Sequence, residues 1–425
     1  MITFDYSLET LKSIINDDTN FSKALKNCFT AHQISQEDSK LVSILVGCEL
    51  RHYYVFNECI NSNIKGLTQD SYLAVALALA NDLFLRRVEA SVALDFVKKI
   101  LKEQNQENLL PEIEKFIQRK IDGEPLIDES IDKFSYRFMS YRFNIPEWVA
   151  KMWSNHFSKN IAYKIAKANS KSPINYLRLN PNNASEEDVF KKPDNGFEKT
   201  DKEGLYIYTG KEQLKKNHTY FTGGLFNESL GYYQLVDAME LDALKDVAII
   251  STYYNPLLTE IAIRLNGTAN VEQIVEPGND FFEFKSASKK YNLKKVQVLD
   301  CNMDALVTAI SKPTSTIVVT PNSSRFDLIR YNPDFFLHFK QDSLDEIIAK
   351  EKMMINEAGK FVEDKGRLVY AVSTINRKET REVVNDFLRK NPDFYLKEEK
   401  QFLPYDASNS CLYYAILVKA EVKHD

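Results

Sequence analysis

Cysteine and histidine are the side chains of this chain that would most readily supply a nucleophile or hold a metal ion. The five cysteines are Cys28, Cys48, Cys59, Cys301 and Cys411. They are scattered and odd in number, and no two form a Cys-x-x-Cys pair, which argues against a disulfide framework and against a zinc site. The six histidines show no metal-ligand spacing. We therefore expect no metal, and we expect Cys301 to be a buried structural thiol rather than a displaced nucleophile.

Two groups of lysines at helical spacing offer a different chemistry, the binding of phosphate. The groups are Lys285, Lys289, Lys290, Lys294 and Lys295, and Lys151, Lys159, Lys164, Lys167 and Lys171. The chain as a whole is not a polycation, because 55 Lys and Arg are balanced by 60 Asp and Glu, for a net charge of -5. Nucleic acid would have to bind through local basic faces. A solvated helix face explains such lysine runs equally well.

The elements that must position these residues begin with a helical region. With 44% hydrophobic residues, the chain is excluded from the intrinsically disordered class. Apolar residues recur at helical spacing from Leu8 to about Arg119, which predicts an all-helical domain over residues 1–125. The segment 72–85 is apolar nearly all round and is expected to be the central helix rather than a membrane span. The acidic stretch 121–134 is expected to be an interdomain linker.

Residues 135–230 and 231–425 are predicted to form two further regions. The first has a helix that begins near Pro146, and short strands over 206–210 and 220–226. In the second, β-branched runs alternate with helical stretches, which is typical of a doubly wound α/β, Rossmann-like sheet. Its predicted strands are 247–251, 271–275, 296–299, 316–320, 367–372 and 412–420. A long helix before the fifth strand is expected to start with a capping box of Ser343 and Glu346 and to end before Gly366.

Three segments carry a resemblance to a known family. They are GCELRH (47–52), YRFNIPEWVAKMWSNHF (141–157) with Arg178-Leu179-Asn180 after it, and LVYAVSTINRKETREVVNDFLRKNPDFYL (368–396). In these segments and their order the chain resembles, over essentially its whole length, the Sun or RsmB group of bacterial 16S rRNA cytosine-C5 methyltransferases. The resemblance implies an N-terminal NusB-like RNA-binding domain, a small α+β connector and a class I methyltransferase domain.

The resemblance also implies where the catalytic groups belong. In that family a cysteine thiolate attacks the base, S-adenosylmethionine supplies the methyl group, and a second cysteine assists release of the adduct. The corresponding positions here are Ser373 and Ser323, and Thr320 stands where the family has an acidic group that contacts the base. No histidine or lysine adjoins Ser373 in sequence to deprotonate it. We therefore expect no catalytic residue, and the chain is read as a degenerate member of the group.

The family's glycine-rich cofactor loop corresponds to residues 249–258, which contain no glycine. Its cofactor-binding positions would be Tyr254 and Asn255. Glu276 is the candidate for the ribose-binding acid, although a solvated loop acid is the simpler interpretation. The candidates near the adenine are Asp300, Asn302 and Asp304. No cofactor is expected, and S-adenosylmethionine is the one implied if the protein is active.

The leading hypothesis is an RNA-binding pseudoenzyme whose partner is structured RNA, either 16S rRNA or the small ribosomal subunit. The expected RNA-binding residues are Arg178, Asn180, Arg330, Lys289 and Lys290. One alternative is an active S-adenosylmethionine-dependent RNA methyltransferase with a rearranged site. Another is a protein-interaction scaffold in ribosome assembly or antitermination, which the net charge mildly favours. A cytoplasmic monomer is expected, with no DNA and no membrane partner.

Overall fold

The computed structural model describes residues 2–191, 196–302, 305, 309–310, 312–406 and 410–421. The chain divides into two compact units, each interrupted by the other in sequence. The helical unit comprises the described residues up to Lys171 together with Leu328–Phe339. The sheet unit comprises Ser172–Asp327 and the described residues from Lys340 onward. The three predicted domains, 1–125, 135–230 and 231–425, are a finer division that stays a prediction.

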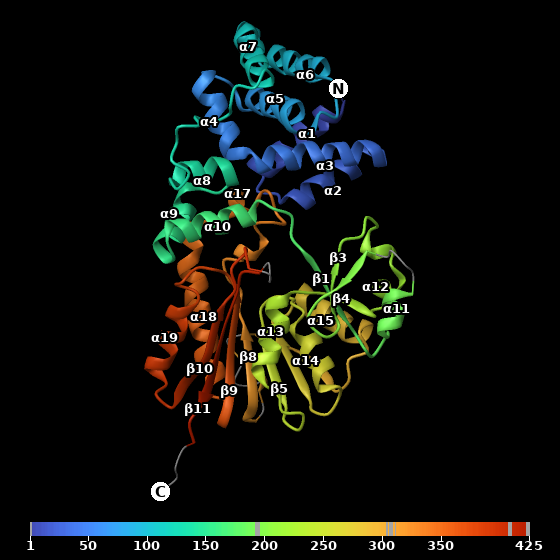
Figure 1. Ribbon diagram of the computed structural model, residues 1–425, viewed down its shortest axis with the longest axis vertical. Coiled ribbons are helices and arrows are strands. Elements are labelled where there is room, and N and C mark those ends of the chain that lie inside the picture. The colour runs from blue at the N-terminus through green and yellow to red at the C-terminus, as the bar shows by residue number, and fades with distance from the viewer. Residues whose placement is uncertain are drawn as a thin grey trace. The chain divides into compact units, whose positions relative to one another are not determined.

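The helical unit confirms the predicted helical N-terminal region (Figure 1). Its elements are α1 (Ile2–Asn16), α2 (Phe21–His32), α3 (Gln36–Arg51), α4 (Tyr53–Asn63), α5 (Gln69–Leu79), the π-helix η1 (Ala80–Leu85), α6 (Ala90–Glu103), the 3-10 turn η2 (Glu107–Leu109), α7 (Leu110–Ile121), α8 (Tyr136–Phe143), α9 (Glu147–His156), α10 (Lys159–Asn169) and α17 (Phe335–His338). Helix α5 is central, since every residue from Leu73 to Leu79 is at most 1% exposed. No helix in the described part of the chain is long and apolar enough to cross a membrane.

The segment Leu328–Phe339 is the part of the helical unit that comes from far along the chain. The buried Asp334 carboxylate accepts a hydrogen bond from the amide of Phe21, at 2.7 Å. His338 Nδ1 lies 2.7 Å from the Asp18 carboxylate. The Trp148 ring of α9 stacks on Phe339, with centroids 5.8 Å apart. These contacts hold the segment to the loop between α1 and α2, to the first residue of α2 and to α9.

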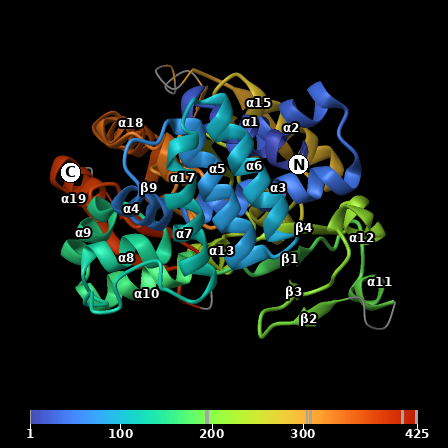
Figure 2. The same ribbon diagram turned by 90° about the horizontal axis from the view of Figure 1, so that it is seen from above.

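The sheet unit contains a small and a large sheet. The small antiparallel sheet has the order β2-β3-β1-β4, from β1 (Asn175–Leu179), β2 (Phe197–Lys199), β3 (Leu205–Tyr208) and β4 (Leu225–Glu228). Figure 2 shows it together with α11 (Glu186–Phe190) and α12 (His218–Phe221). The predicted strand over 220–226 is wrong in its first half. Asn217 caps a short helix there, with its side chain accepting from the amide of Tyr220 at 3.0 Å.

The large sheet has seven strands in the order β10-β11-β9-β8-β5-β6-β7, and the five strands from β9 to β7 are parallel. The strands are β5 (Val247–Ser251), β6 (Val271–Val275), β7 (Val296–Asp300), β8 (Thr314–Thr320), β9 (Val362–Ser373), β10 (Phe394–Gln401) and β11 (Leu412–Lys419). The six predicted strands all form. Strand β10 was not predicted, because an edge strand with one solvated face carries the charged residues Lys-Glu-Glu-Lys.

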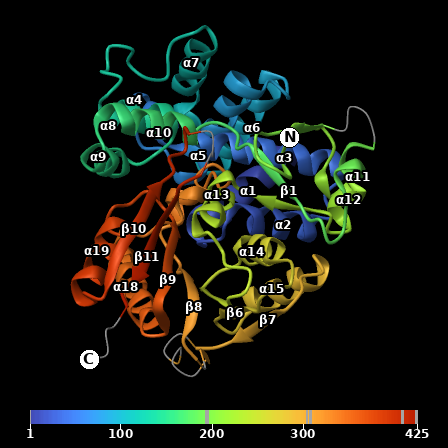
Figure 3. The ribbon, with the colours of Figure 1, turned by 60° about the horizontal axis from the view of Figure 1, so that its bottom comes forward.

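Helices cover both faces of the large sheet, as expected of a doubly wound fold (Figure 3). One face packs against α18 (Leu344–Gly359) and α19 (Arg381–Lys390). The other packs against α13 (Leu230–Met239), α14 (Leu257–Leu265) and α15 (Asn279–Lys290). The predicted Rossmann-like fold class is therefore confirmed.

Helix α18 begins directly after Ser343, as predicted, but the predicted capping box and the predicted end are wrong. Ser343 closes a 3-10 turn, η6 (Gln341–Ser343), and its hydroxyl donates to the Lys340 carbonyl at 2.7 Å, so it makes no capping box with Glu346. The helix ends at Gly359, and Gly366 lies within β9. A Cβ at Gly366 would come within 2.9 Å of the Ser315 carbonyl oxygen, so glycine serves there for a close strand approach rather than as a helix end.

Candidate functional site at the carboxyl edge of the large sheet

The carboxyl ends of the parallel strands bring several of the predicted site residues to one edge of the large sheet. Ser251 ends β5, Thr320 ends β8, and Ser373 ends β9, with Ser251 and Thr320 directly paired in register. Glu276 follows β6, and Asp300 ends β7. Ligands of open α/β sheets bind at this edge, because loops rather than helices cover it. The edge is therefore where a methyl-transfer site would be assembled.

Two tyrosine hydroxyls enclose Ser373. The Tyr232 hydroxyl, from α13, lies 3.2 Å from Ser373 Oγ, and the Tyr253 hydroxyl, from the loop after β5, lies 3.4 Å from it. The two tyrosine hydroxyls are 3.2 Å apart. Ser373 itself is 4% exposed. Burial raises the pKa of Tyr232 well above its ordinary value, so this hydroxyl stays neutral and cannot act as a base toward serine.

Arg325 fixes Tyr253 in this position. Its guanidinium lies over the Tyr253 ring, 4.3 Å from the centroid, and its Nε donates to Asp327 at 3.0 Å. A cation over an aromatic face is attracted by the ring quadrupole, more strongly where water is partly excluded. The stack holds the Tyr253 hydroxyl beside Ser373.

The other family-equivalent position, Ser323, is also buried, at 4% exposure, and its Oγ accepts from the Arg325 amide at 3.3 Å. The Thr320 hydroxyl lies 2.6 Å from Ser251 Oγ, and Asn255 Nδ2 donates to it at 3.2 Å. Serine and threonine hydroxyls here satisfy one another. None of these partners could take a proton from a nucleophile.

A buried carboxylate beside this edge was not predicted. Glu379 Oε1 accepts from the Ser324 amide at 2.5 Å, and Oε2 accepts from Asn376 Nδ2 at 2.8 Å. The Ser324 and Thr374 hydroxyls are 2.6 Å apart. Burial raises the pKa of Glu379. It also raises the pKa of Glu351, on α18, to about 10, with the charge of Glu379 as the second cause. This network ties the loop after β8 to the loop after β9.

The loop that would hold a cofactor is closed by its own contacts. The Tyr254 amide donates to Asp280 Oδ1 at 2.8 Å, and the Tyr254 ring packs on Phe284, with centroids 5.0 Å apart. Asn255 is 2% exposed, and its Oδ1 accepts from the Leu257 amide at 3.2 Å. A glycine-rich loop offers unoccupied backbone N–H groups to a ligand. In this loop the amides of Tyr254 and Leu257 already donate to side chains of the protein. These residues do not fit a cofactor bound in that manner.

The acidic candidates lie at the surface. Glu276, Asp300 and Asn302 are exposed, and Asp304 lies outside the described residues. Cys301 is half-buried rather than buried, because it lies in the loop beyond the edge strand β7, and its Sγ is 3.2 Å from the Asn302 carbonyl oxygen. Cys411 also lies at this end of the sheet, directly before β11. It is 2% exposed, with Sγ 3.6 Å from the Phe326 carbonyl oxygen, and is therefore shielded from a substrate.

Two of the residues predicted to bind RNA are held inside the sheet unit. Arg178, at 8% exposure, donates from Nε to Glu260 Oε2 at 3.0 Å. Asn180 is fully buried, and its Nδ2 donates to the carbonyls of Gly223 and Tyr291, each at 2.9 Å. These contacts give both side chains a structural role. Arg330 belongs to the helical unit and is half-buried.

The remaining RNA candidates form a basic and aromatic surface, which we call the α12–α15 patch. Its members are Lys215, Lys216, His218, Phe221, Lys289 and Lys290, all exposed. Lys290 Nζ lies 5.1 Å from the ring centroid of Tyr220 in α12, and Asn183 Nδ2 donates to both the Lys290 and Thr222 carbonyls. The Phe221 ring is 72% exposed. Sequence reasoning found the lysines of α15 but missed α12, which joins them only through the fold.

Comparison with known proteins places these observations in a family context. No family model matches the chain. The chain is 22% identical over 413 residues to the probable ribosomal RNA small subunit methyltransferase B of Bacillus subtilis, covering 92% of this chain and 89% of the relative. It is also 35% identical over 66 residues to the ribosomal RNA small subunit methyltransferase F of Erwinia tasmaniensis, covering 16% and 14%. The resemblance to Sun-type rRNA methyltransferases is confirmed.

Solved structures agree with this fold. The crystal structure of PH0851 matches with a TM-score of 0.73 and 14% identity, covering 98% of both chains. The structure of NSun6 from Pyrococcus horikoshii with SFG matches with a TM-score of 0.60 and 14% identity, covering 66% of this chain and all of that one. The Sun-type likeness thus extends to the overall architecture.

Proposed function

We propose that this protein binds structured RNA of the small ribosomal subunit and does not transfer methyl groups to cytosine. The observation that carries the proposal is the enclosure of Ser373 by the hydroxyls of Tyr232 and Tyr253. The small-subunit RNA partner follows from the relatives, whose names describe ribosomal RNA small subunit methyltransferases.

The chemistry of the site supports the loss of methyl transfer. Attack on a cytosine ring needs a strong nucleophile at neutral pH, and a thiolate supplies one whereas an unassisted serine hydroxyl does not. The described side-chain partners of Ser373 are two tyrosine hydroxyls, and neither is a general base such as histidine. To reach Ser373, a cytosine base would also have to displace the Tyr253 ring and the Arg325 guanidinium stacked on it. We accordingly propose that the site uses no S-adenosylmethionine.

The α12–α15 patch supports RNA binding. Lysine neutralises phosphate charge, and an exposed aromatic ring offers a stacking surface to an unpaired base. Phe221 supplies such a ring on α12, the helix whose Tyr220 ring lies 5.1 Å from Lys290 Nζ. We propose that this patch is the principal RNA-binding surface, that Arg330 contributes, and that the protein acts as a monomer in the cytoplasm.

The deciding experiment is an isotope-transfer assay with labelled S-adenosylmethionine and under-methylated 16S rRNA. A relative with measured activity serves as the positive control. We expect no transfer to cytosine C5, together with RNA binding in a gel-shift assay on the same preparation. Methylation at C5, or micromolar binding of S-adenosylmethionine by calorimetry, would replace the proposal with that of an active enzyme.

A pull-down from cell extract separates RNA binding from a protein scaffold. We expect ribosomal RNA to be recovered with the protein, and the co-purifying ribosomal proteins to be lost after nuclease treatment. Partners that survive the nuclease would favour the scaffold instead.

A further inference from the structure

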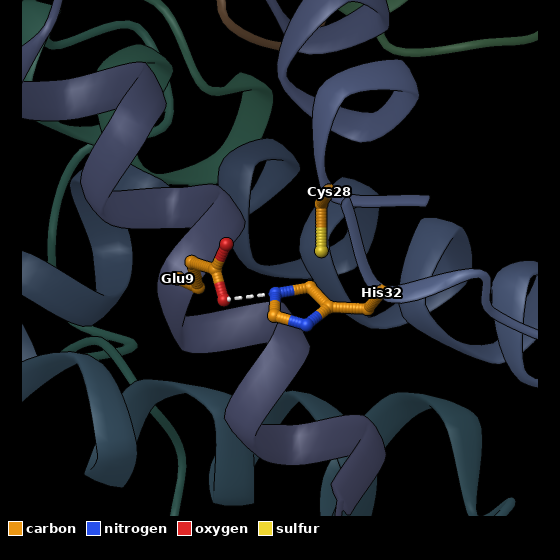
Figure 4. A group of neighbouring side chains, drawn as sticks. All are labelled: Glu9, Cys28 and His32. Atoms are coloured by element: carbon orange, nitrogen blue, oxygen red, sulfur yellow. Dashed lines mark hydrogen bonds and ion pairs between the residues drawn. The ribbon is translucent and has the colours of Figure 1, made fainter. Parts of the chain in front are cut away.

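Helices α1 and α2 of the helical unit bring three metal-ligating side chains together. Cys28 and His32 lie four residues apart on one face of α2, and Glu9 faces them from α1 (Figure 4). The Cys28 sulfur, a ring nitrogen of His32 and a carboxylate oxygen of Glu9 all lie within 4.8 Å of one another. His32 Nε2 and Glu9 Oε2 are 2.8 Å apart. Among the described residues, no other group of three or more such side chains is this close.

The surroundings make this a formed site with one open side. Cys28 is 4% exposed, with Sγ 3.8 Å from the Tyr6 carbonyl oxygen. The His32 ring packs against the Tyr6 ring, with centroids 4.7 Å apart. Glu9 and His32 are exposed, so an ion and a water molecule can reach them from solvent. The thiol thus forms the closed inner side and the other two groups form the outer side.

The start of α2 is anchored, which limits how far the ligands can drift apart. Asn20 caps the helix, with its side chain accepting from the Lys23 amide at 2.9 Å. The Phe21 amide donates to the buried Asp334 at 2.7 Å. The two helices also share the helical unit's core, to which Leu8, Leu11 and Leu25 belong. A ligand set held between packed helices needs only side-chain adjustment to bind an ion.

We propose that Glu9, Cys28 and His32 bind a zinc ion, with a water molecule as the fourth ligand. One thiolate, one imidazole and one carboxylate are the ligand types that zinc takes in a tetrahedral site. On binding, the Cys28 thiol releases its proton to solvent. The His32 Nε2 proton is exchanged through solvent for one on Nδ1, so that Nε2 and the Glu9 carboxylate can bind the ion in place of their hydrogen bond. The ion's double charge is balanced by the thiolate and the carboxylate. The bound ion would cross-link α1 to α2. This zinc site depends neither on RNA binding nor on the residues at the edge of the large sheet.

The chain offers a matched control. Cys48 and His52 have the same four-residue spacing, and their Sγ and Nδ1 atoms are 3.7 Å apart. His52 Nδ1 also lies 2.8 Å from the Cys48 carbonyl oxygen, and its ring stacks on Phe84, with centroids 3.9 Å apart. The described residues provide this pair with no third ligand. Replacing Cys48 therefore removes a Cys–His pair without touching the proposed site.

The test is titration of the metal-free full-length protein with Co²⁺, followed by competition with Zn²⁺. We expect one equivalent of Co²⁺ to give a thiolate-to-metal charge-transfer band and the visible bands of a four-coordinate ion, and Zn²⁺ to abolish them. Cys28→Ser should lose the charge-transfer band, whereas Cys48→Ser should keep it. Zn²⁺ should also raise the Tm of the wild-type protein but not of Cys28→Ser.

Two further variants guard against misfolding of the cysteine mutant. Because Glu9 and His32 are exposed, Glu9→Gln and His32→Gln should keep the far-ultraviolet circular dichroism of the wild type and weaken Co²⁺ binding at least about tenfold. The proposal is overturned if the wild type gives no charge-transfer band, if Cys28→Ser retains it, or if folded His32→Gln binds Co²⁺ as tightly as the wild type.

Discussion

Arg178 and Glu260 form an ion pair inside the sheet unit, with Nε and Oε2 3.0 Å apart. Glu260 is entirely buried, and its other carboxylate oxygen accepts from Arg264 Nε at 2.6 Å. A buried carboxylate depends on such partners, because removing one leaves charge uncompensated in a medium of low polarity. Arg178 therefore joins the small sheet to α14, although the sequence motif around it had suggested contact with RNA.

Arg178→Met is expected to lower the free energy of unfolding by about 3 kcal/mol, because the buried Glu260 carboxylate loses one of its two arginine partners. Urea denaturation of the full-length protein measures this. Adding Glu260→Gln should recover part of the loss.

The double variant Arg178→Glu and Arg330→Glu should weaken RNA association, and comparison with Arg178→Met shows how much of that effect is unfolding. An Arg178→Met protein as stable as the wild type would contradict the structural role of Arg178 as a partner of Glu260.

Substitutions in the α12–α15 patch should weaken RNA binding without loss of stability. We expect Lys289→Glu with Lys290→Glu to reduce the slope of log affinity against log salt by about 1.4, for two lost single-strand phosphate contacts at about 0.7 each. Phe221→Ala should reduce affinity with little change in that slope, because stacking is not ionic. Filter binding over a salt series measures both. The control Lys245→Glu with Lys350→Glu, at exposed positions on other elements, should bind normally.

Restoring the sulfur atoms should not restore methyl transfer. We expect Ser373→Cys with Ser323→Cys to show no isotope transfer above background, because Tyr232 and Tyr253 still enclose the first position and the loop at Tyr254 is unchanged. Ser373→Ala should leave RNA binding and any cellular phenotype as they are. Transfer by the double-cysteine variant would show that the sulfurs alone had been missing.

Stability should fall as pH rises because of Glu351. Burial raises its folded-state pKa from the ordinary value of 4.5 to about 10, so its contribution is fully present at low pH and is lost as pH rises from about 4.5 toward about 10. The slope is at most about 1.4 kcal/mol per pH unit. Urea unfolding at about pH 6 and about pH 8 should show a smaller difference for Glu351→Gln than for the wild type. Glu346→Gln, exposed on the same helix, should resemble the wild type.

The sequence was sufficient for what depends on local pattern. The run Val247–Ser251 is apolar in its first four residues, three of them β-branched, because helices bury both faces of its sheet, and that signal needs no partner. Strand β10 gave no such signal, since an edge strand is half solvated. The enclosure of Ser373 was equally out of reach, because Tyr232 approaches it from a helix far away in sequence. The burial of Arg178 was hidden for the same reason, as its partner Glu260 lies on another element.

Because Leu328–Phe339 belongs to the helical unit, that unit can be completed only late in synthesis of the chain. A ribosome releases the α1–α2 loop early, yet the partners of Asp18 and Phe21 are His338 and Asp334, which emerge after β8. The N-terminal helices therefore lack these contacts while most of the parallel strands are translated. A nascent chain stalled before residue 328 would be more sensitive to protease at this loop than the finished protein, and the two units would mature together rather than one after the other.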